Sequence, residues 1–312
     1  MPTVTVTGGA GFIGSHLVHA LLASGYDVRV LDDFSTGRLA NLQDVLQTIE
    51  LIEGSILDKN PLARSMDGAE YVFHLAAQVS VPFSMQNPEH TMEINGAGTQ
   101  RVLEAAFQAG CRRVVYAGSS SCYGDVGNSV QSETDQIAPI SPYGISKYQG
   151  EEYCHEMAES GKIETVTLRY FNVFGPGQDS ASPYSAVIPK FISLLMAGKR
   201  PTIFGDGTQS RDFTYVQNVV DANLLAIEAD GVSGHSINVA NGRSISLLKL
   251  IELLCENLQT DVEPIFAEAR KGDILHSCAT IAKARQLLGY TPSVSIEAGL
   301  ATTINSLTGH VE

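Results

Sequence analysis

The sequence predicts an α/β protein built around a doubly wound parallel sheet, with a smaller C-terminal lobe. Three observations predict it. Short β-rich runs alternate with helical stretches over the first half, a glycine-rich turn follows the first strand, and the pattern loosens after about residue 175. Near-continuous apolar strands separated by helices are typical of parallel sheets covered on both faces. Right-handed crossovers give the doubly wound arrangement, whose ligands bind at the carboxyl ends of the strands.

The expected elements follow in chain order. We expect strands at 3–8, 27–33, 70–77, 112–120 and 164–175, and helices at 14–25, at 98–110 and from near Ser146. Beyond a Gly-, Pro- and Ser-rich loop at 175–185, we expect a helix at 186–198, a strand, turn and strand at 201–216, and an amphipathic helix at 246–258. We therefore place one domain at 1–175 and a lobe at 176–312, with about 201–228 returning to the first domain.

Composition and charge limit the classes of function. The chain has 312 residues, 44% of them hydrophobic and 17% charged, as in a globular protein. Its formal net charge of −14 argues against broad nucleic-acid binding, which needs a basic surface. A small anionic ligand remains possible, because a few arginines or helix N-termini suffice to bind one.

The cysteines and the apolar runs indicate a cytoplasmic protein. The five cysteines are scattered without a CxxC pair, which is typical of reduced thiols and predicts no metal site. No apolar run approaches the roughly 20 residues of a membrane span. The first residues, MPTVTVTGG, enter a strand at once and lack the basic region of a signal peptide. We expect neither a membrane nor a nucleic-acid partner.

A phosphate-binding loop is predicted at "TGGAGFIG", residues 7–14. Gly9, Gly11 and Gly14 satisfy GxGxxG, and Gly8, Gly11 and Gly14 satisfy GxxGxxG. Glycines let the backbone approach a pyrophosphate closely, and the helix N-terminus then offers free N–H groups. The second strand ends in Asp32, 18 residues after Gly14. A carboxylate there binds the adenosine ribose and repels a 2′-phosphate, which favours NAD over NADP.

Tyr143 and Lys147, in "YGISK", are the candidate acid–base pair. Residues four apart share one face of a helix, so both side chains would project toward the cofactor. A free tyrosine, with a pKa of about 10, is a poor base at neutral pH. A nearby ammonium and the positive nicotinamide ring both favour the phenolate. Taken alone, the YxxxK pattern is common and also fits an unremarkable surface pair.

Several motifs together resemble one family. The glycine loop, Asp32, "HLAAQ" (74–78), Asn95, "SSSCYG" (119–124) and "YGISK" (143–147) are similar to the extended short-chain dehydrogenase/reductase family, in its nucleotide-sugar branch. The stretches "LRYFNVFGP" (168–176), "FGDGTQSRDFTYV" (204–216) and "RKGDILHS" (270–277) extend the resemblance over essentially the whole chain. The resemblance implies a Rossmann domain at 1–175 that binds NAD and a substrate-binding lobe after it.

The resemblance also implies roles for individual residues. Tyr143 would be the acid/base, Lys147 would hold the nicotinamide ribose, and Ser119 would bind the sugar hydroxyl being oxidised. The cofactor would be bound by Gly8, Gly11, Phe12, Ile13, Gly14, Asp32, Asp33, Ser35, Thr36, Gly37, Ser55, Ile56, Leu75, Ala76, Ala77, Gln78, Asn95, Tyr143, Lys147 and Tyr170. The uridine diphosphate sugar would be bound by Ser80, Ser119, Ser120, Tyr143, Asn172, Val187, Arg211, Arg270, Asp273 and Ser277.

Two of these positions carry open questions. The family often has an aspartate where this chain has Ser55, and a serine there implies altered contacts to adenine. Arg211 would pair with the phosphates through its fork of N–H groups. It could instead form a salt bridge with Asp206 or Asp212.

The residues after Ser119 indicate which reaction follows oxidation of the sugar. Related 4,6-dehydratases carry Asp-Glu directly after the catalytic hydroxyl residue, and UDP-glucuronate decarboxylases carry a glutamate two positions after it. This chain has Ser120 and Ser121, which cannot act as carboxylates. Epimerisation at C4 through a transient 4-keto sugar needs no further base. The alternatives are a UDP-glucuronate 4-epimerase or decarboxylase, and a non-catalytic NAD-binding regulator, although regulators usually lose the tyrosine or the lysine.

The resemblance also suggests the sugar and the assembly. In UDP-glucose 4-epimerases, the residue four positions after the aspartate of a Gly-Asp pair sets the size of the sugar pocket. Here the pair is Gly272–Asp273 and the residue is Ser277, whose small side chain admits an N-acetyl group. We expect a preference for UDP-N-acetylglucosamine, with UDP-glucose also accepted, although Ser277 could be an ordinary turn serine. The helix at 98–110 and the one near Ser146 predict a homodimer through a four-helix interface.

Overall fold

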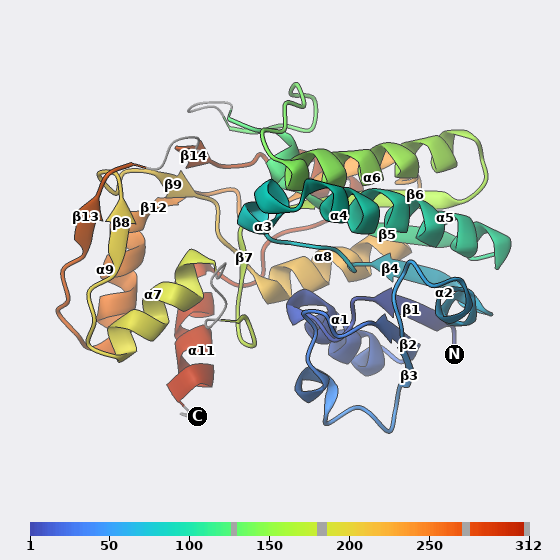
Figure 1. Ribbon diagram of the computed structural model, residues 1–312, viewed down its shortest axis with the longest axis horizontal. Coiled ribbons are helices and arrows are strands. Elements are labelled where there is room, and N and C mark those ends of the chain that lie inside the picture. The colour runs from blue at the N-terminus through green and yellow to red at the C-terminus, as the bar shows by residue number, and fades with distance from the viewer. Residues whose placement is uncertain (126–129, 180–185, 270–274, 309–312) are drawn as a thin grey trace.

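A seven-stranded parallel sheet lies at the centre of the larger part of the molecule (Figure 1). The computed structural model describes residues 1–125, 130–179, 186–269 and 275–308. The strand order is β11-β6-β5-β4-β1-β2-β3, and every neighbouring pair is parallel. The strands are β1 (Thr3–Thr7), β2 (Asp27–Asp32), β3 (Glu50–Glu53), β4 (Tyr71–His74), β5 (Arg113–Ser119), β6 (Glu164–Tyr170) and β11 (His235–Val239). The order reverses at β1, as in doubly wound sheets, which confirms the predicted fold class.

The edge strand β11 is absent from the sequence prediction. Its residues alternate between apolar and polar, so they resemble a strand with one face in water. The side chains of Ser236 and Asn238 are nevertheless buried. Ser236 donates to Glu151 and Asn238 accepts from Tyr123, so partners from distant segments satisfy them.

Helices cover both faces of this sheet. One face carries α1 (Phe12–Ala23), α8 (Val216–Glu228) and α10 (Ala282–Leu288), and the other carries α2 (Lys59–Met66), α5 (Gly98–Gln108) and α6 (Pro142–Glu159). Each face has its own buried apolar cluster. Leu17 and Val220 belong to the first, while Leu103 and Cys154 belong to the second. Helix α6 begins four residues before the expected Ser146, because Ser141 caps it by accepting from the Gly144 amide and Pro142 occupies its first turn.

A second group of elements lies beside the sheet, on the left of Figure 1. Its helices are α7 (Val187–Met196), α9 (Leu247–Leu258) and α11 (Ile296–Thr308). Its strands are β8 (Thr202–Phe204), β9 (Ser210–Arg211), β12 (Ile245–Ser246), β13 (Ile265–Ala267) and β14 (His276–Ser277), and β7 (Val173–Phe174) pairs with β10 (Thr214–Tyr215). A third apolar cluster, which includes Phe191, Leu250 and Leu300, holds these helices together. The division of the chain at residue 175 stays a prediction.

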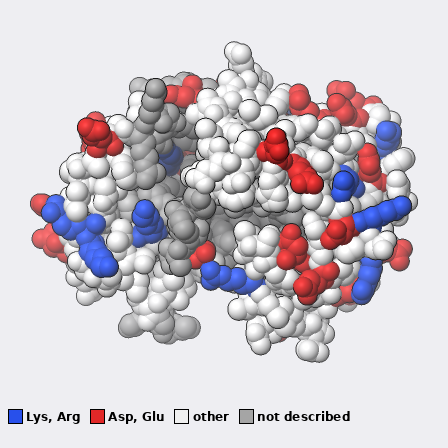
Figure 2. All heavy atoms as spheres, in the orientation of Figure 1, with Lys and Arg blue, Asp and Glu red and all other residues white. Residues whose placement is uncertain are grey.

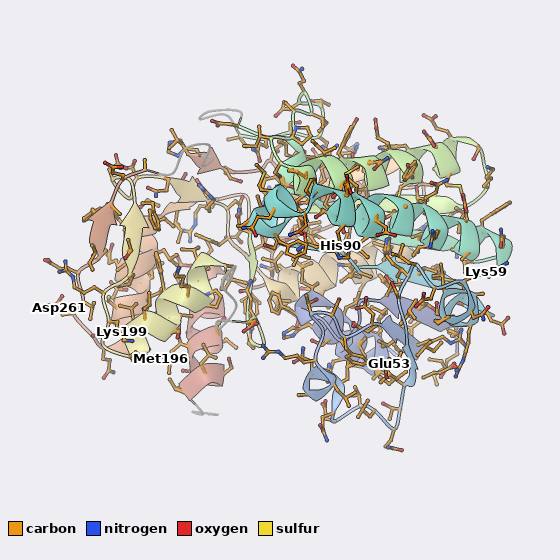
Figure 3. The ribbon with its side chains drawn as sticks, in the orientation of Figure 1. Glu53, Lys59, His90, Met196, Lys199 and Asp261 are labelled. Carbon is orange, nitrogen blue, oxygen red and sulfur yellow. The ribbon has the colours of Figure 1, made fainter. Side chains whose placement is uncertain are left out.

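The two ends of the molecule are formed by different elements. In Figure 3, Met196, Lys199 and Asp261 lie at the end formed by α7, α9 and β13, while Glu53 and Lys59 lie at the opposite end with the sheet. On the face shown in Figure 2, acidic side chains are spread over both ends, with Lys and Arg interspersed. Within the described ranges, the structure contains no helix that is both long and apolar enough to cross a lipid bilayer.

Candidate active site

The glycine loop lies where β1 turns into α1. Gly8 has φ +71°, and a Cβ built on it would lie 2.7 Å from the Ala76 amide nitrogen. A Cβ on Gly14 would lie 2.1 Å from the Gly8 carbonyl oxygen, so a side chain at either position would collide with backbone. Helix α1 then begins at Phe12, with Gly11 as its N-cap and Ile13 in its first turn. The loop therefore presents bare backbone at a helix N-terminus, as pyrophosphate binding requires.

Asp32 stands at the carboxyl end of β2, next to this loop. Its carboxylate accepts from the Ala10 amide (2.8 Å) and from the Phe34 amide (2.9 Å). Burial raises the pKa of Asp32, and the two amides oppose that increase. A Cβ on Gly37 would lie 2.6 Å from its Oδ1, so Gly37 leaves room for the carboxylate. Asp33 beyond it accepts from the amide and hydroxyl of Ser35, in the loop that also contains Thr36.

Ser55 caps the turn that follows β3. Its hydroxyl accepts from the Leu57 amide (3.2 Å), and the Asp58 carboxylate accepts from the Ser55 amide (3.2 Å). An aspartate therefore lies beside Ser55 although it is displaced by three positions in the sequence. The next residue, Ile56, is buried and packs where a Cβ on Gly98 would stand.

A buried chain of hydrogen bonds supports the loop after β4. Thr99 Oγ1 donates to the Asn95 carbonyl (2.6 Å) and lies 2.9 Å from His74 Nε2. His74 Nδ1 lies 2.8 Å from Thr7 Oγ1, which in turn accepts from the Ala76 amide (3.3 Å). Burial lowers the pKa of His74 to about 3, with a smaller contribution from Lys147, so the ring is neutral. Sequence reasoning missed this role of His74, although "HLAAQ" contains it.

Asn95 ties the same loop to α6. It lies in η2 (Glu93–Ala97), a π-helical turn between α4 (Pro88–Met92) and α5. Its side-chain amide accepts from the Gln78 backbone amide (2.8 Å) and donates to the Gln78 carbonyl (2.9 Å) and to Ser146 Oγ (3.0 Å). Leu75, Ala76 and Ala77 therefore lie in a loop that is anchored at both ends. The Gln78 Oε1 is buried without a hydrogen-bond partner, as expected of an acceptor reserved for a ligand.

The start of α6 packs directly on the turn after β5. A Cβ on Gly144 would lie 2.7 Å from the Ser121 carbonyl oxygen, so only glycine allows this contact. The Tyr143 amide donates to Ser84 Oγ (3.1 Å), from α3 (Val81–Gln86). Ser84 is fully buried, and no signal in the sequence indicated that it would help to fix Tyr143.

The side chains of Ser119 and Tyr143 lie next to each other where α6 packs on the turn after β5. Burial raises the pKa of Tyr143, and a hydrogen bond with the Ser119 side chain opposes the increase. The Ser119 hydroxyl also accepts from the amide (3.2 Å) and hydroxyl (2.9 Å) of Ser121. Ser120 lies between them in η3 (Ser120–Cys122). Two hydroxyls and one phenol are thus gathered at the carboxyl end of β5.

Lys147 lies one turn beyond Tyr143 on α6 and is only 4% exposed. Its ammonium nitrogen lies 4.3 Å from the centre of the Tyr116 ring, whose hydroxyl donates to the Lys147 carbonyl (3.1 Å). Burial lowers the pKa of Lys147 to about 7. An amine with this pKa gains and loses its proton near neutrality, which is typical of active-site lysines.

Three predicted substrate residues, Arg211, Asn172 and Ser277, lie close together around Asp212. Ser277 of β14 is the register partner of Arg211 on the parallel strand β9, so their side chains point to the same face. Arg211 donates to the carbonyls of Ser210 (3.0 Å) and Leu275 (3.2 Å). Asn172 has φ +34° and donates to the Asp212 carbonyl (3.0 Å). The described contacts of the Asp212 carboxylate go to backbone amides and to Cys278.

The remaining predicted residues are less closely grouped. Ser80 caps α3 by accepting from the Phe83 amide, and Val187 begins α7. The Tyr170 hydroxyl is bonded to Asn223 of α8 (3.0 Å), so its contact with the cofactor stays a prediction. Arg270 and Asp273 lie outside the described residues.

Comparison with known proteins identifies the family. The NAD dependent epimerase/dehydratase family matches residues 4–240. The chain belongs to this family. NAD is therefore its cofactor, and the glycine loop, Asp32 and the unpartnered Gln78 acceptor fit such a group. The sequence-based resemblance to the nucleotide-sugar branch of the extended short-chain dehydrogenases is thereby confirmed at the level of the family.

Individual relatives span more than one reaction. The chain is 37% identical over 303 residues to a UDP-glucose 4-epimerase of Mycolicibacterium smegmatis, covering 96% of each. It is 31% identical over 310 residues to a UDP-N-acetyl-α-D-glucosaminuronate decarboxylase of Bacillus cytotoxicus, covering 96% of this chain and 95% of the relative. A solved UDP-N-acetylglucosamine 4-epimerase of Methanobrevibacter ruminantium, in complex with UDP-N-acetylmuramic acid, has a TM-score of 0.94 at 37% identity, covering 99% and 98% of the chains.

Proposed function

We propose that this enzyme interconverts UDP-sugars that differ at C4, with UDP-N-acetylglucosamine and UDP-N-acetylgalactosamine as the preferred pair. UDP-glucose and UDP-galactose would be accepted as well. The observation that carries the proposal is the cluster of Ser119, Tyr143 and Lys147, together with the two residues after Ser119. At those positions the chain has the hydroxyls of Ser120 and Ser121 instead of carboxylates. The epimerase relatives of this length support the same reaction.

The chain's own residues supply the proton chemistry. Tyr143 would remove the proton of the 4-hydroxyl group. It would return a proton after the 4-keto sugar has rotated in the site and presented its opposite face. Ser119 would hydrogen-bond that oxygen and orient it toward the phenol. The Lys147 ammonium favours the phenolate form of Tyr143, because an opposite charge nearby stabilises an anion. Bound NAD supplies the acceptor, and later the donor, of one hydride.

The residues after Ser119 argue against further chemistry on the keto sugar. A dehydratase needs an additional acid and base, and the related decarboxylases use a glutamate at the position of Ser121. The Ser121 hydroxyl instead donates to Ser119, so it belongs to the same hydroxyl cluster. Because neither position has a carboxylate, we expect the keto sugar to be reduced again and not to undergo dehydration or decarboxylation.

The UDP part of the substrate would lie against β9 and β14. We propose that Arg211 binds the diphosphate and that Asn172 and Ser277 line the remainder of the site. Arg211 and Ser277 share one face of the small sheet, which supports this placement. The residue proposed to bind the diphosphate then lies beside the residue proposed to line the sugar pocket. Arg270 and Asp273 are proposed as further contacts from the sequence alone.

Incubation of the purified protein with UDP-N-acetylglucosamine, followed by chromatography of the products, tests the proposal. We expect formation of UDP-N-acetylgalactosamine at equilibrium with the starting sugar. Interconversion of UDP-glucose and UDP-galactose without any conversion of the N-acetylated sugar would contradict the substrate preference. Release of carbon dioxide from UDP-glucuronate would contradict the epimerase assignment itself.

Substitution of Ser277 by tyrosine is expected to suppress the N-acetylated substrate selectively. Ser277 is buried beside Arg211, so a large ring has to displace part of the sugar pocket. A misfit in a substrate pocket is worth about 1–3 kcal/mol, which corresponds to roughly 10- to 200-fold in kcat/KM. Kinetics with UDP-N-acetylglucosamine and UDP-glucose measure the ratio, and Ser277→Ala serves as the control that keeps the pocket open. Equal losses on both sugars would remove Ser277 as the selectivity residue.

We also propose a homodimer that is assembled through α5 and α6, and a cytoplasmic location. The two helices pack against one another on one face of the sheet, and Phe107 on α5 is 45% exposed. Light scattering of the purified protein measures the mass in solution and tests the dimer.

A further inference from the structure

Asp212 is a completely buried carboxylate that the proposed reaction does not use. It follows Arg211 at the end of β9 and has no exposed surface. A carboxylate without water is costly unless donors surround it. Its position beside three proposed substrate residues therefore raises the question of what this side chain holds together.

The carboxylate joins the edge of the large sheet to the small one. Its Oδ1 accepts from the Asn241 amide (2.9 Å) and its Oδ2 from the Gly242 amide (3.0 Å), in the loop just after β11. The same Oδ2 accepts from the Ala279 amide (3.3 Å), just after β14, and lies 3.8 Å from the Cys278 sulfur. Burial raises the pKa of Asp212 to about 7, and these donors oppose the increase.

The backbone of Asp212 contacts the proposed substrate site directly. Its amide donates to the Ser277 carbonyl (2.7 Å), and its carbonyl accepts from the Asn172 side chain (3.0 Å). Asn172 has the left-handed φ of +34°, which an asparagine adopts more readily than most residues, and the bond to Asp212 helps to hold it there. One residue thus touches Asn172 and Ser277 and adjoins Arg211.

We propose that Asp212 is a positioning residue that fixes Arg211, Ser277 and Asn172 relative to the large sheet, on which helix α6 with Tyr143 packs. It does so without touching the nucleotide sugar. The inference rests on the proposed function, since these three residues are proposed to bind UDP-sugar. Loss of the hydrogen bonds of the Asp212 carboxylate would weaken substrate binding and leave the proton chemistry at Tyr143 intact.

Asp212→Asn tests the inference with little change of shape. An amide has only one acceptor oxygen, so its NH₂ group would face a backbone N–H in place of the lost oxygen. A buried backbone N–H left without an acceptor costs about 1–3 kcal/mol, which predicts a rise of roughly 5- to 150-fold in the KM for the UDP-sugar. We expect kcat and the NAD affinity to stay near those of the wild type. Asp206→Asn is the matched control, because Asp206 is exposed and accepts from Thr208 in the same segment.

The division between KM and kcat separates positioning from a general structural role. Partial unfolding reduces the amount of active enzyme, which lowers the apparent kcat and leaves KM unchanged. An unchanged KM in Asp212→Asn would overturn the inference while the epimerase proposal stands. If the wild type converts no UDP-sugar, the proposed function fails, and calorimetric titration with UDP then decides whether Asp212→Asn still weakens binding.

Hydrogen exchange of the wild type provides a test that needs no variant. We expect UDP to slow exchange in peptides that contain Asn241 and Gly242 or Ala279, because Asp212 links these amides to the site. A peptide from β13 should not change. Unchanged exchange in both linked peptides would contradict the inference even if Asp212→Asn fails to fold.

Discussion

Tyr143→Phe is expected to lower turnover of the UDP-sugar by about 100- to 10,000-fold, the usual contribution of a positioned acid–base group. The ring, its packing and the backbone bond to Ser84 all remain, so the variant should fold and bind NAD as the wild type does. Only the oxygen that exchanges the proton is lost. Initial rates with UDP-N-acetylglucosamine and UDP-glucose, together with calorimetric titration of NAD, measure the two effects separately.

The same helix supplies a control for this prediction. Tyr148 lies five residues further along α6 and is also half-buried, but it is not part of the cluster with Ser119. Tyr148→Phe should leave turnover within about twofold of the wild type, as is usual for substitutions away from the reacting groups. Comparable losses in both variants would point to a general effect on α6, and full activity of Tyr143→Phe would remove Tyr143 from its proposed role.

The dependence of the rate on pH provides a second check on Tyr143. Burial raises the pKa of its phenol, so the phenolate is scarce at neutral pH unless nearby groups stabilise it. The fraction present as phenolate increases with pH until the phenol has ionised. The ammonium of Lys147, whose pKa is about 7, is lost as pH rises. The kcat/KM of the wild type should therefore pass through a maximum as pH rises, while the residual activity of Tyr143→Phe should lack the rising limb.

Local patterns predicted the parts of the site that depend on short stretches of chain. The glycine spacing predicted the loop whose Cβ positions are blocked by backbone, and the i, i+4 spacing placed Tyr143 and Lys147 on one helical face. Family resemblance added Ser119. None of these inferences required knowledge of which distant segments meet.

The parts that sequence reasoning missed depend on contacts between distant segments. In the sequence nothing distinguishes Asp212 from the other acidic residues. In the structure, the loops after β11 and β14 donate backbone amides to its carboxylate. His74 bonds to Thr7 and Thr99, which come from a different strand and a helix. Hydrophobic periodicity gives no information about such partners, because it reports burial and not the identity of neighbours.

A buried ion pair beneath the catalytic helix gives the largest expected effect on stability. Glu151 follows Lys147 by one turn on α6, and Arg169 lies on β6, and the two are 2% and 3% exposed. Arg169 donates through Nε to Glu151 Oε2 (2.9 Å), a second guanidinium nitrogen bonds to Oε1, and the third donates to the Tyr123 hydroxyl (2.7 Å). Removal of one partner leaves the other charge buried and unpaired, which costs several kcal/mol.

Glu151→Gln is therefore expected to lower the free energy of unfolding by about 3–5 kcal/mol. Urea titration followed by far-ultraviolet circular dichroism measures the loss, since the chain has no tryptophan to report unfolding by fluorescence. The control is Arg243→Met, which breaks the surface pair of Arg243 and Glu297, whose side chains are 57% and 48% exposed. Exposed pairs contribute about 0–1 kcal/mol, so this variant should remain close to the wild type.

A double variant separates the two explanations of such a loss. If the cost comes from an unpaired buried charge, Glu151→Leu with Arg169→Met removes both charges and should be more stable than Glu151→Gln. The recovery should be incomplete, because Tyr123 and Ser236 each lose a hydrogen-bond partner in the pair. If instead the double variant is less stable than Glu151→Gln, the pair contributes through its hydrogen bonds, and the attachment of α6 to β6 depends on that polar network.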